Sequence, residues 1–126
     1  MSIIKKLIEV QDKLKAPKDQ KNSFANYRFR SAESILEAVK PLLKEQGLYL
    51  SMTDSVDLVG ARFYVKATVT VEDEEGNSKS VSALAREEDT KKGFDSSQIT
   101  GASSSYARKY ALSGLFAIDD NRDSDA

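Results

Sequence analysis

The sequence predicts an α+β domain in which a three-stranded antiparallel sheet is backed by helices. Two observations support this fold class. Apolar residues recur at helical spacing near the start, in residues 31–47 and in residues 96–116, whereas residues 48–87 alternate between apolar and polar side chains. The chain has 126 residues, which is enough for a single core and one domain. We therefore expect the order helix, short extended segment, helix, three strands, helix.

The first predicted helix covers about the first 13 residues after the start. Its apolar residues are spaced to form a single stripe: Ile3, Leu7, Val10 and Leu14. Residues 16–26 contain Pro17 and mainly polar or charged side chains, which predicts an exposed connector. Residues 26–30 alternate aromatic and basic side chains, so we expect a brief strand that places Arg28 and Arg30 on one face.

The second predicted helix has signals at both ends. Ser31 is a good N-cap, Glu33 suits the positive end of the helix dipole, and Gly47 stands where a left-handed C-cap belongs. Pro41 removes one backbone hydrogen bond, so we expect a kink near residues 37–41. The predicted core stripe consists of Ile35, Leu36, Val39, Leu42 and Leu43.

Three strands are predicted at residues 48–53, 56–71 and 79–87. The second alternates most clearly, and its apolar face consists of Phe63, Val65, Ala67, Val69 and Val71. Its polar face carries Arg62, Tyr64 and Lys66. Residues 72–77 are acidic and contain Gly76, which predicts a turn. Residues 88–95 are predicted to form a polar loop that holds Lys91 and Lys92.

The last predicted helix begins at Ser96 or Ser97, and Ile99, Tyr106 and Tyr110 recur along it at helical spacing. A second stripe carries Arg108 and Lys109 with no carboxylate beside them, a surface that suits a phosphate backbone. The alternative is an ordinary amphipathic helix with a solvated cation pair. A flank of small residues leaves room for a close-packed neighbour and favours self-association: Thr100, Ser104, Ala107 and Ala111.

The composition argues against an enzyme or a metalloprotein. The chain has no His and no Cys, which removes histidine-dependent nucleophile pairs, thiolate ligands and disulfides. No glycine-rich phosphate loop precedes a Lys-Ser/Thr pair, so no ATP site is expected. Asp119, Asn121 and Asp123 resemble half of a calcium loop but lack its sixth-position glycine. We expect no cofactor, no metal, no signal peptide, no membrane span and a cytoplasmic protein.

The charge distribution points to nucleic acid as a ligand. The net charge is only -1, but residues 1–30 hold eight Lys/Arg against three Asp/Glu, and residues 96–110 are also basic. The candidate phosphate contacts are Arg28, Arg30, Arg62, Lys66, Lys91, Lys92, Arg108 and Lys109. The candidate base-stacking residues are Tyr27, Tyr64 and Tyr106. For Tyr27, Phe29, Tyr106 and Tyr110, packing in a core or an interface is favoured over base stacking.

Three segments resemble the Erf (essential recombination function) family of phage and prophage proteins. They are the Tyr-Arg-Phe-Arg-Ser-Ala opening from Tyr27, the Pro-Leu-Leu-Lys…Gly-Leu helix end from Pro41, and residues 101–116 with their Tyr-Ala-Arg-Lys-Tyr motif. The resemblance implies ATP-independent binding and annealing of single-stranded DNA in recombination inside a bacterial host. It also implies a core similar to that of the eukaryotic ring-forming annealing proteins.

The resemblance further implies a homo-oligomer in a ring or curved filament, with an exonuclease or a single-strand binding protein of host or phage as a further partner. We expect residues 1–118 to form the annealing domain and the acidic residues 119–126 to be disordered. Two alternatives remain open from the residues themselves. One is a module that binds duplex DNA or structured RNA, and the other is a structural oligomer that binds no nucleic acid.

Overall fold

The computed structural model describes residues 1–15, 20–22, 27–29, 31–86 and 96–118. Within these residues, three helices and two small sheets follow one another as α1 (Ile3–Lys13), β1 (Gln20–Asn22), β2 (Tyr27–Phe29), α2 (Ala32–Glu45), β3 (Tyr49–Val59), β4 (Arg62–Glu72), β5 (Ser78–Arg86) and α3 (Ser96–Leu115). Strands β3, β4 and β5 form a three-stranded antiparallel sheet, and β1 pairs with β2 in a separate hairpin. The predicted α+β class and the order of its main elements are confirmed.

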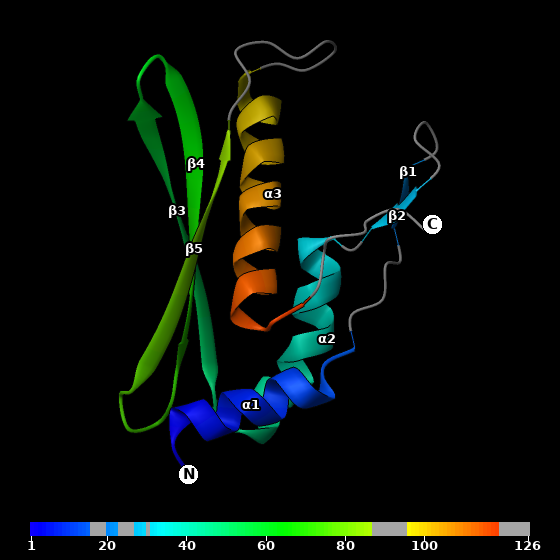
Figure 1. Ribbon diagram of the computed structural model, residues 1–126, viewed down its shortest axis with the longest axis vertical. Helices are drawn as coiled ribbons and strands as arrows, with labels where there is room; N and C mark the ends of the chain where they lie inside the picture. The colour runs from blue at the N-terminus through cyan, green and yellow to red at the C-terminus, as the bar shows by residue number, and fades with distance from the viewer. Residues whose placement is uncertain (16–19, 23–26, 30, 87–95, 119–126) are drawn as a thin grey trace.

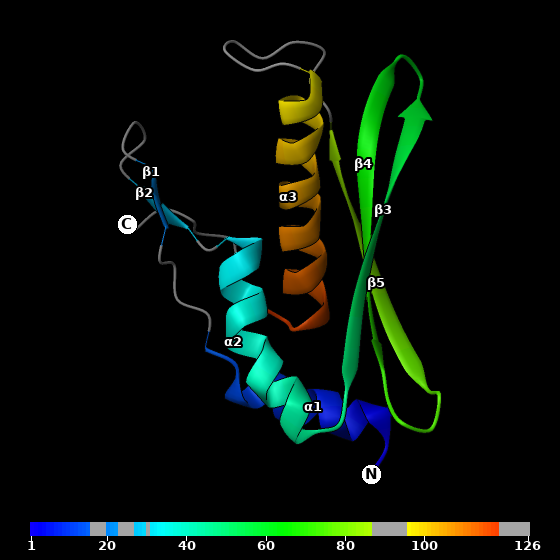
Figure 2. The ribbon, with the colours of Figure 1, turned by 180° about the vertical axis from the view of Figure 1, so that it is seen from behind.

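All three helices lie on one side of the three-stranded sheet (Figures 1 and 2). Helix α3 runs along the sheet, α2 packs behind α3, and α1 crosses below them at the end where β3 begins. The side-chain amide of Gln11 on α1 donates a hydrogen bond of 2.9 Å to the carbonyl oxygen of Leu115 and ties α1 to the end of α3. None of the described elements covers the other face of the sheet, which is called the open face below.

The first two helices form where their capping residues and apolar stripes predict them. Ser2 caps α1, and its hydroxyl accepts a hydrogen bond of 3.2 Å from the backbone of Lys5. Ser31 caps α2 in the same way through the backbone of Ser34, at 3.0 Å. Gly47 ends α2 with φ +65°, the left-handed conformation that glycine adopts without strain. Helix α2 continues through Pro41, and the kink expected there stays a prediction.

The sheet differs from the sequence prediction at one turn. Strand β3 runs to Val59, and a two-residue loop of Gly60 and Ala61 leads into β4, so residues 56–59 belong to β3. The predicted strand from 56 to 71 was therefore wrong at its start. Gly60 has φ +63°, as the first central residue of a type II′ turn requires, and this single glycine interrupts an otherwise continuous apolar-polar alternation.

The second turn was predicted correctly. The carboxylate of Asp73 accepts hydrogen bonds from the backbone of Glu75 at 3.0 Å and of Asn77 at 2.8 Å. Gly76 follows with φ +87°. An aspartate that bonds its own following backbone is a common way to build such a turn.

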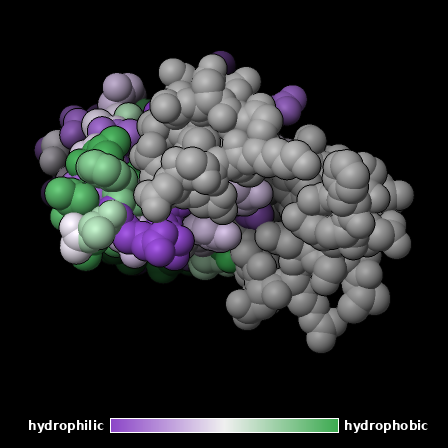
Figure 3. All heavy atoms as spheres, turned by 90° about the horizontal axis from the view of Figure 1, so that it is seen from above, coloured by the Kyte–Doolittle hydropathy of each residue, from purple (hydrophilic) through white to green (hydrophobic). Residues whose placement is uncertain are grey.

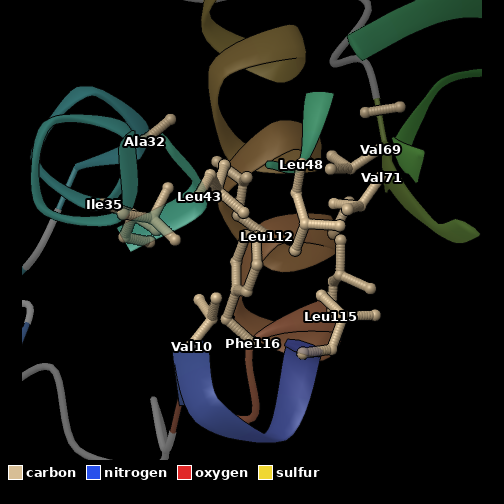
Figure 4. Close-up of a cluster of buried hydrophobic side chains, with 14 of the residues drawn as sticks. Val10, Ala32, Ile35, Leu43, Leu48, Val69, Val71, Leu112, Leu115 and Phe116 are labelled. Atoms are coloured by element: carbon tan, nitrogen blue, oxygen red, sulfur yellow. The ribbon is translucent and has the colours of Figure 1, made fainter. Parts of the chain in front are cut away.

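The core lies between the sheet and α3 and extends to α1 and α2 (Figure 4). Leu112 and Phe116 fill its centre and are almost wholly buried, and Val69 and Val71 meet them from β4. The sheet side of α3 carries small residues, and a Cβ added at Gly114 would lie 3.1 Å from Cγ1 of Val81. Helix α3 therefore packs very closely on the sheet.

This close packing corrects two expectations about α3. Ala107 and Ala111 are fully buried within the chain, so they do not form a surface for a neighbouring copy. A core position, one of the two that were favoured for Tyr106 and Tyr110, is excluded because these residues are 50% and 46% exposed, whereas their packing at an interface stays a prediction. Small residues face the sheet in a helix that lies this close, since larger side chains would hold the two layers apart.

Candidate nucleic-acid interface

The open face of the sheet carries the cations and the aromatic residue that the alternation of β4 predicted. Directly opposed residues in an antiparallel pair point to the same face, and Val65, which packs in the core, fixes which face that is. Arg62, Tyr64 and Lys66 therefore lie on the open face. Arg62 and Lys66 are exposed and form no ion pair within the described part of the chain. They are available to bind an anion.

Rows of hydroxyl groups continue this face toward the other end of the sheet. The hydroxyls of Thr68 and Ser82 are hydrogen-bonded at 2.8 Å, and those of Thr70 and Ser80 at 2.8 Å. The register places Thr53 opposite Thr68 and extends one of the rows onto β3. Hydroxyl side chains commonly bind phosphate oxygens and sugars in protein–DNA complexes.

The charges on the open face gather at one end of it. Arg86 lies opposite Tyr64 and adds a third exposed cation near the β3–β4 turn, and Asp57 lies opposite Tyr64 on the other side. Glu72 stands at the far end of β4. The half of the open face near the turn is therefore positively charged, and the middle of the face is neutral and rich in hydroxyls.

Arg108 lies on the opposite, helix-covered side of the sheet and is held by a carboxylate. Its Nε and Nη2 atoms donate hydrogen bonds of 3.1 and 2.9 Å to the two carboxylate oxygens of Asp54 on β3. The hydroxyl of Ser104 donates to the same carboxylate at 2.5 Å. The Arg108 and Asp54 side chains are 39% and 25% exposed. The expectation that no carboxylate lies beside Arg108 was wrong, because Asp54 comes from a strand 54 residues away in the sequence.

This arrangement stabilises the charged form of Asp54. Burial alone would raise the pKa of Asp54, but hydrogen bonds from Arg108 and Ser104, together with the charge of Arg108, outweigh it and hold the pKa below its ordinary value of 3.8. Asp54 is therefore ionised at neutral pH, and a phosphate that binds Arg108 has to compete with it.

Lys109 is not the exposed cation that the sequence predicted. Its residue is only 3% exposed, and its Nζ atom lies 5.9 Å from the ring centroid of Tyr110. A cation at this distance over a tyrosine ring is attracted by the ring. The rings of Tyr106 and Tyr110 are stacked, with centroids 6.4 Å apart and an interplanar angle of 24°. The two exposed tyrosines form an aromatic surface on α3.

The amino-acid sequence of the chain is similar to that of known proteins. The family model of the ERF superfamily matches residues 3–126. The chain belongs to the ERF superfamily. It is 61% identical over 120 residues to the essential recombination function protein of Salmonella phage P22, and the match covers 95% of the chain. The chain spans 57% of the length of that relative. No solved structure matches it. The family resemblance inferred from the sequence is confirmed.

Several predicted contacts of this ERF-superfamily chain lie outside the described residues or side chains. The brief strand predicted around Arg28 is confirmed as β2, but the side chains of Tyr27, Arg28 and Phe29 are not described. Arg30, Lys91, Lys92 and residues 119–126 lie outside the described residues. The connector expected at 16–26 contains β1, and this strand was missed because three residues are too few to show a periodic pattern.

The described residues show neither a metal cluster nor a membrane helix. No group of three or more acidic side chains among them is placed to hold a metal ion. None of the described helices is long and apolar enough to cross a membrane.

The end of the sheet near the β3–β4 turn is apolar as well as basic, and its exposed apolar residues are Val56, Leu58, Val59 and Phe63. Figure 3 shows hydrophobic surface gathered on the side of the molecule where the sheet lies.

Proposed function

We propose that the chain binds single-stranded DNA and anneals complementary strands without a nucleotide cofactor, as a homo-oligomer in phage or prophage recombination. The observation that carries this proposal is the open face of the sheet, where Arg62 and Lys66 are exposed and form no ion pair within the described chain. Membership of the ERF superfamily and the 61% identity to a phage recombination protein support it.

The proposed mechanism is electrostatic and geometric. Exposed cations on the open face hold the phosphate backbone, and the neighbouring hydroxyls of Thr68 and Thr70 bind phosphate or sugar oxygens. A strand that is held by its backbone keeps its base edges accessible, so a second strand can test for pairing. Duplex stacking then contributes about 1.4 kcal/mol per base-pair step. The protein itself makes and breaks no covalent bond.

Arg108 provides a second, conditional contact in this proposal. Its guanidinium is 39% exposed and already neutralised by Asp54, so it binds a phosphate only when that phosphate replaces the carboxylate. The open face does not carry this penalty, because Arg62 and Lys66 have no such partner among the described residues. We therefore assign the main backbone contacts to the open face and a tuning role to Arg108.

The decisive test compares two double variants with the same loss of charge. Arg62→Gln/Lys66→Gln removes two of the three exposed cations of the open face, and Lys5→Gln/Lys44→Gln removes two exposed cations from the helices. Fluorescence anisotropy with a labelled single-stranded oligonucleotide should show about a tenfold loss of affinity in the first variant alone. The slope of log affinity against log salt should fall by about 1.4 in that variant, at about 0.7 per phosphate contact.

Three outcomes would contradict the proposal. Equal losses in the two double variants would show that only net charge matters and that the open face is not the site. Tighter binding to duplex DNA or to double-stranded RNA than to single strands would support the duplex-binding alternative. Annealing of complementary oligonucleotides should proceed in EDTA without ATP, and a requirement for either a metal or a nucleotide would reveal a different mechanism.

A further inference from the structure

The three-stranded sheet has two edges that no described strand pairs with. The strand order β3-β4-β5 leaves one side of β3, with 11 residues, and one side of β5, with 9 residues, unpaired by the described residues. Exposed edge strands present backbone donors and acceptors that can pair with another chain. Native proteins usually blunt such edges with proline, central lysines or bulges. Neither strand has a proline, β3 has no lysine, and its register with β4 is continuous from Tyr49 to Val59.

The two edge strands carry opposite charges. Strand β3 contains Asp54 and Asp57 and no cation, whereas β5 contains Lys79 and Arg86 and no acid. Arg108 already neutralises Asp54, so Asp57 is the carboxylate of β3 without an ion pair among the described residues. Opposite charges on the two edges favour contact between β3 of one copy and β5 of another, and they disfavour contact between two identical edges.

The register places these charges at the same level of the sheet. Asp57, Tyr64 and Arg86 form one row across the three strands on the open face. Strands β3 and β5 both run antiparallel to β4, so they run in the same direction. A second copy rotated about an axis along the strands would therefore place its β3 parallel to β5 of the first copy. With the rows aligned, Arg86 of one copy lies beside Asp57 of the next.

The hydroxyl rows reach both edges in the same way. The row of Thr53, Thr68 and Ser82 ends in a hydroxyl on each edge, and so does the row that contains Thr70. The bonds between β4 and β5 show that opposed hydroxyls in these rows are close enough to pair, at 2.8 Å. Alignment of the rows would repeat this pairing across the boundary between copies.

The helix side of the sheet offers matching apolar surfaces. On the side of β3, Val56 and Leu58 are 55% and 62% exposed. On α3, Ser103 and Gly114 face β5 and Arg108 faces β3, so helical geometry places the exposed Tyr106 and Tyr110 on the flank beyond β5. In the alignment described above, the apolar residues of β3 approach these two tyrosines of the adjacent copy.

We propose that β3 of one copy pairs with β5 of the next and continues the sheet through the assembly, with Asp57 and Arg86 setting the register. This inference rests on the homo-oligomer in the proposed function but not on DNA binding. A contact between two different edges is head-to-tail, so it generates a ring when the rotation closes and a filament when it does not. The helices of all copies then lie on one side of the shared sheet and the open faces on the other.

Charge reversal and mixing test the pairing. Asp57→Arg and Arg86→Asp each place like charges at the contact, and each should raise the concentration needed for half-assembly by about tenfold. The double variant Asp57→Arg/Arg86→Asp should assemble again, and so should an equimolar mixture of the two single variants, because every contact in the mixture can pair opposite charges. Glu37→Arg and Lys44→Asp reverse exposed charges on α2 and serve as controls that should assemble normally.

Mass measurement by analytical ultracentrifugation over a range of protein concentrations gives the result, with circular dichroism to confirm that each variant folds. Single variants that keep the wild-type mass would overturn the proposal. So would folded single variants that dissociate and are rescued neither by the double change nor by mixing, and so would a wild-type protein that stays monomeric at micromolar concentration with single-stranded DNA. A wild-type protein that assembles but does not bind single-stranded DNA would instead refute the proposed function and leave the pairing in place.

Discussion

Replacement of Arg108 by alanine should destabilise the fold, because this side chain joins α3 to β3. The change removes two hydrogen bonds of 3.1 and 2.9 Å to Asp54 and leaves that carboxylate with the hydroxyl of Ser104. The two side chains are 39% and 25% exposed, so solvent screens their attraction. Exposed ion pairs contribute about 0.2 to 1 kcal/mol to stability, and the two-pronged geometry of this pair favours the upper end, at about 1 kcal/mol.

The expected change in melting temperature follows from the size of the chain. Unfolding entropy is about 2.1 cal/mol/K per residue. For 126 residues, a loss of about 1 kcal/mol therefore lowers Tm by about 4 °C. Thermal unfolding of wild type, Arg108→Ala, Asp54→Asn and the double variant at one fixed protein concentration gives the coupling energy between the two side chains. Arg108→Lys keeps the charge but loses the planar guanidinium that donates two hydrogen bonds, so it should recover only part of the lost stability.

A coupling energy below about 0.2 kcal/mol would refute this reasoning, since the pair would then contribute nothing measurable. Arg108 would in that case be a solvated cation, as the helix alone had suggested. The sequence places Arg108 among the DNA contacts, and the stability measurement separates that role from the structural one, because a phosphate contact has no effect on unfolding in the absence of DNA.

Three further predictions concern the same region and the second turn. The pKa of Asp54 is lowered in the folded state, so the stabilising effect of its carboxylate is full above the ordinary value of 3.8 and is lost as the pH falls through the folded pKa. The free energies of unfolding of wild type and Asp54→Asn in urea should therefore differ at pH 7 and converge in acid. Asp54→Asn should also increase affinity for single-stranded DNA and raise the slope of log affinity against log salt by about 0.7, because Arg108 is then no longer neutralised by a carboxylate. An unchanged slope in anisotropy titrations would show that Arg108 makes no phosphate contact. Gly76→Ala should cost about 1 to 2 kcal/mol in chemical unfolding, because φ is +87° and an added Cβ meets no neighbour that could compensate, whereas an unchanged stability would show that the turn relaxes.

The sequence predicted those parts of the fold that depend on local periodicity. The apolar stripe of α1 around Leu7 covers several helical turns, and the alternation of β4 around Val69 covers several residue pairs. Each pattern is therefore clear without any knowledge of the element that packs against it. The turn at Gly60 was missed because one glycine in an alternating segment resembles an interruption rather than an end. The three residues of β1 are too short for any periodic signal.

The candidate site was predictable on the sheet and not on α3. Arg62 and Lys66 lie on the face that alternation with Val65 assigns to them. The partner of Arg108 is Asp54, and nothing in the local sequence of either residue indicates this long-range pair. Lys109 is buried although lysine is rarely buried, and the side of α3 that faces the sheet carries small residues, such as Ala107 and Ala111, that do not stand out as an apolar stripe. Tertiary packing decided these positions.

The one-sided arrangement of helices divides the sheet residues into two groups that evolve under different constraints. Residues such as Ala67 and Val69 face the helices, so most changes there are removed through loss of folding. The exposed positions on the open face, such as Lys66 and Ser82, contribute little to the core, and substitutions at such surface positions usually alter stability by about 0.5 kcal/mol or less. Sequence constraint on that face across the superfamily would therefore record selection by a ligand or a partner, whereas free variation would record the absence of one.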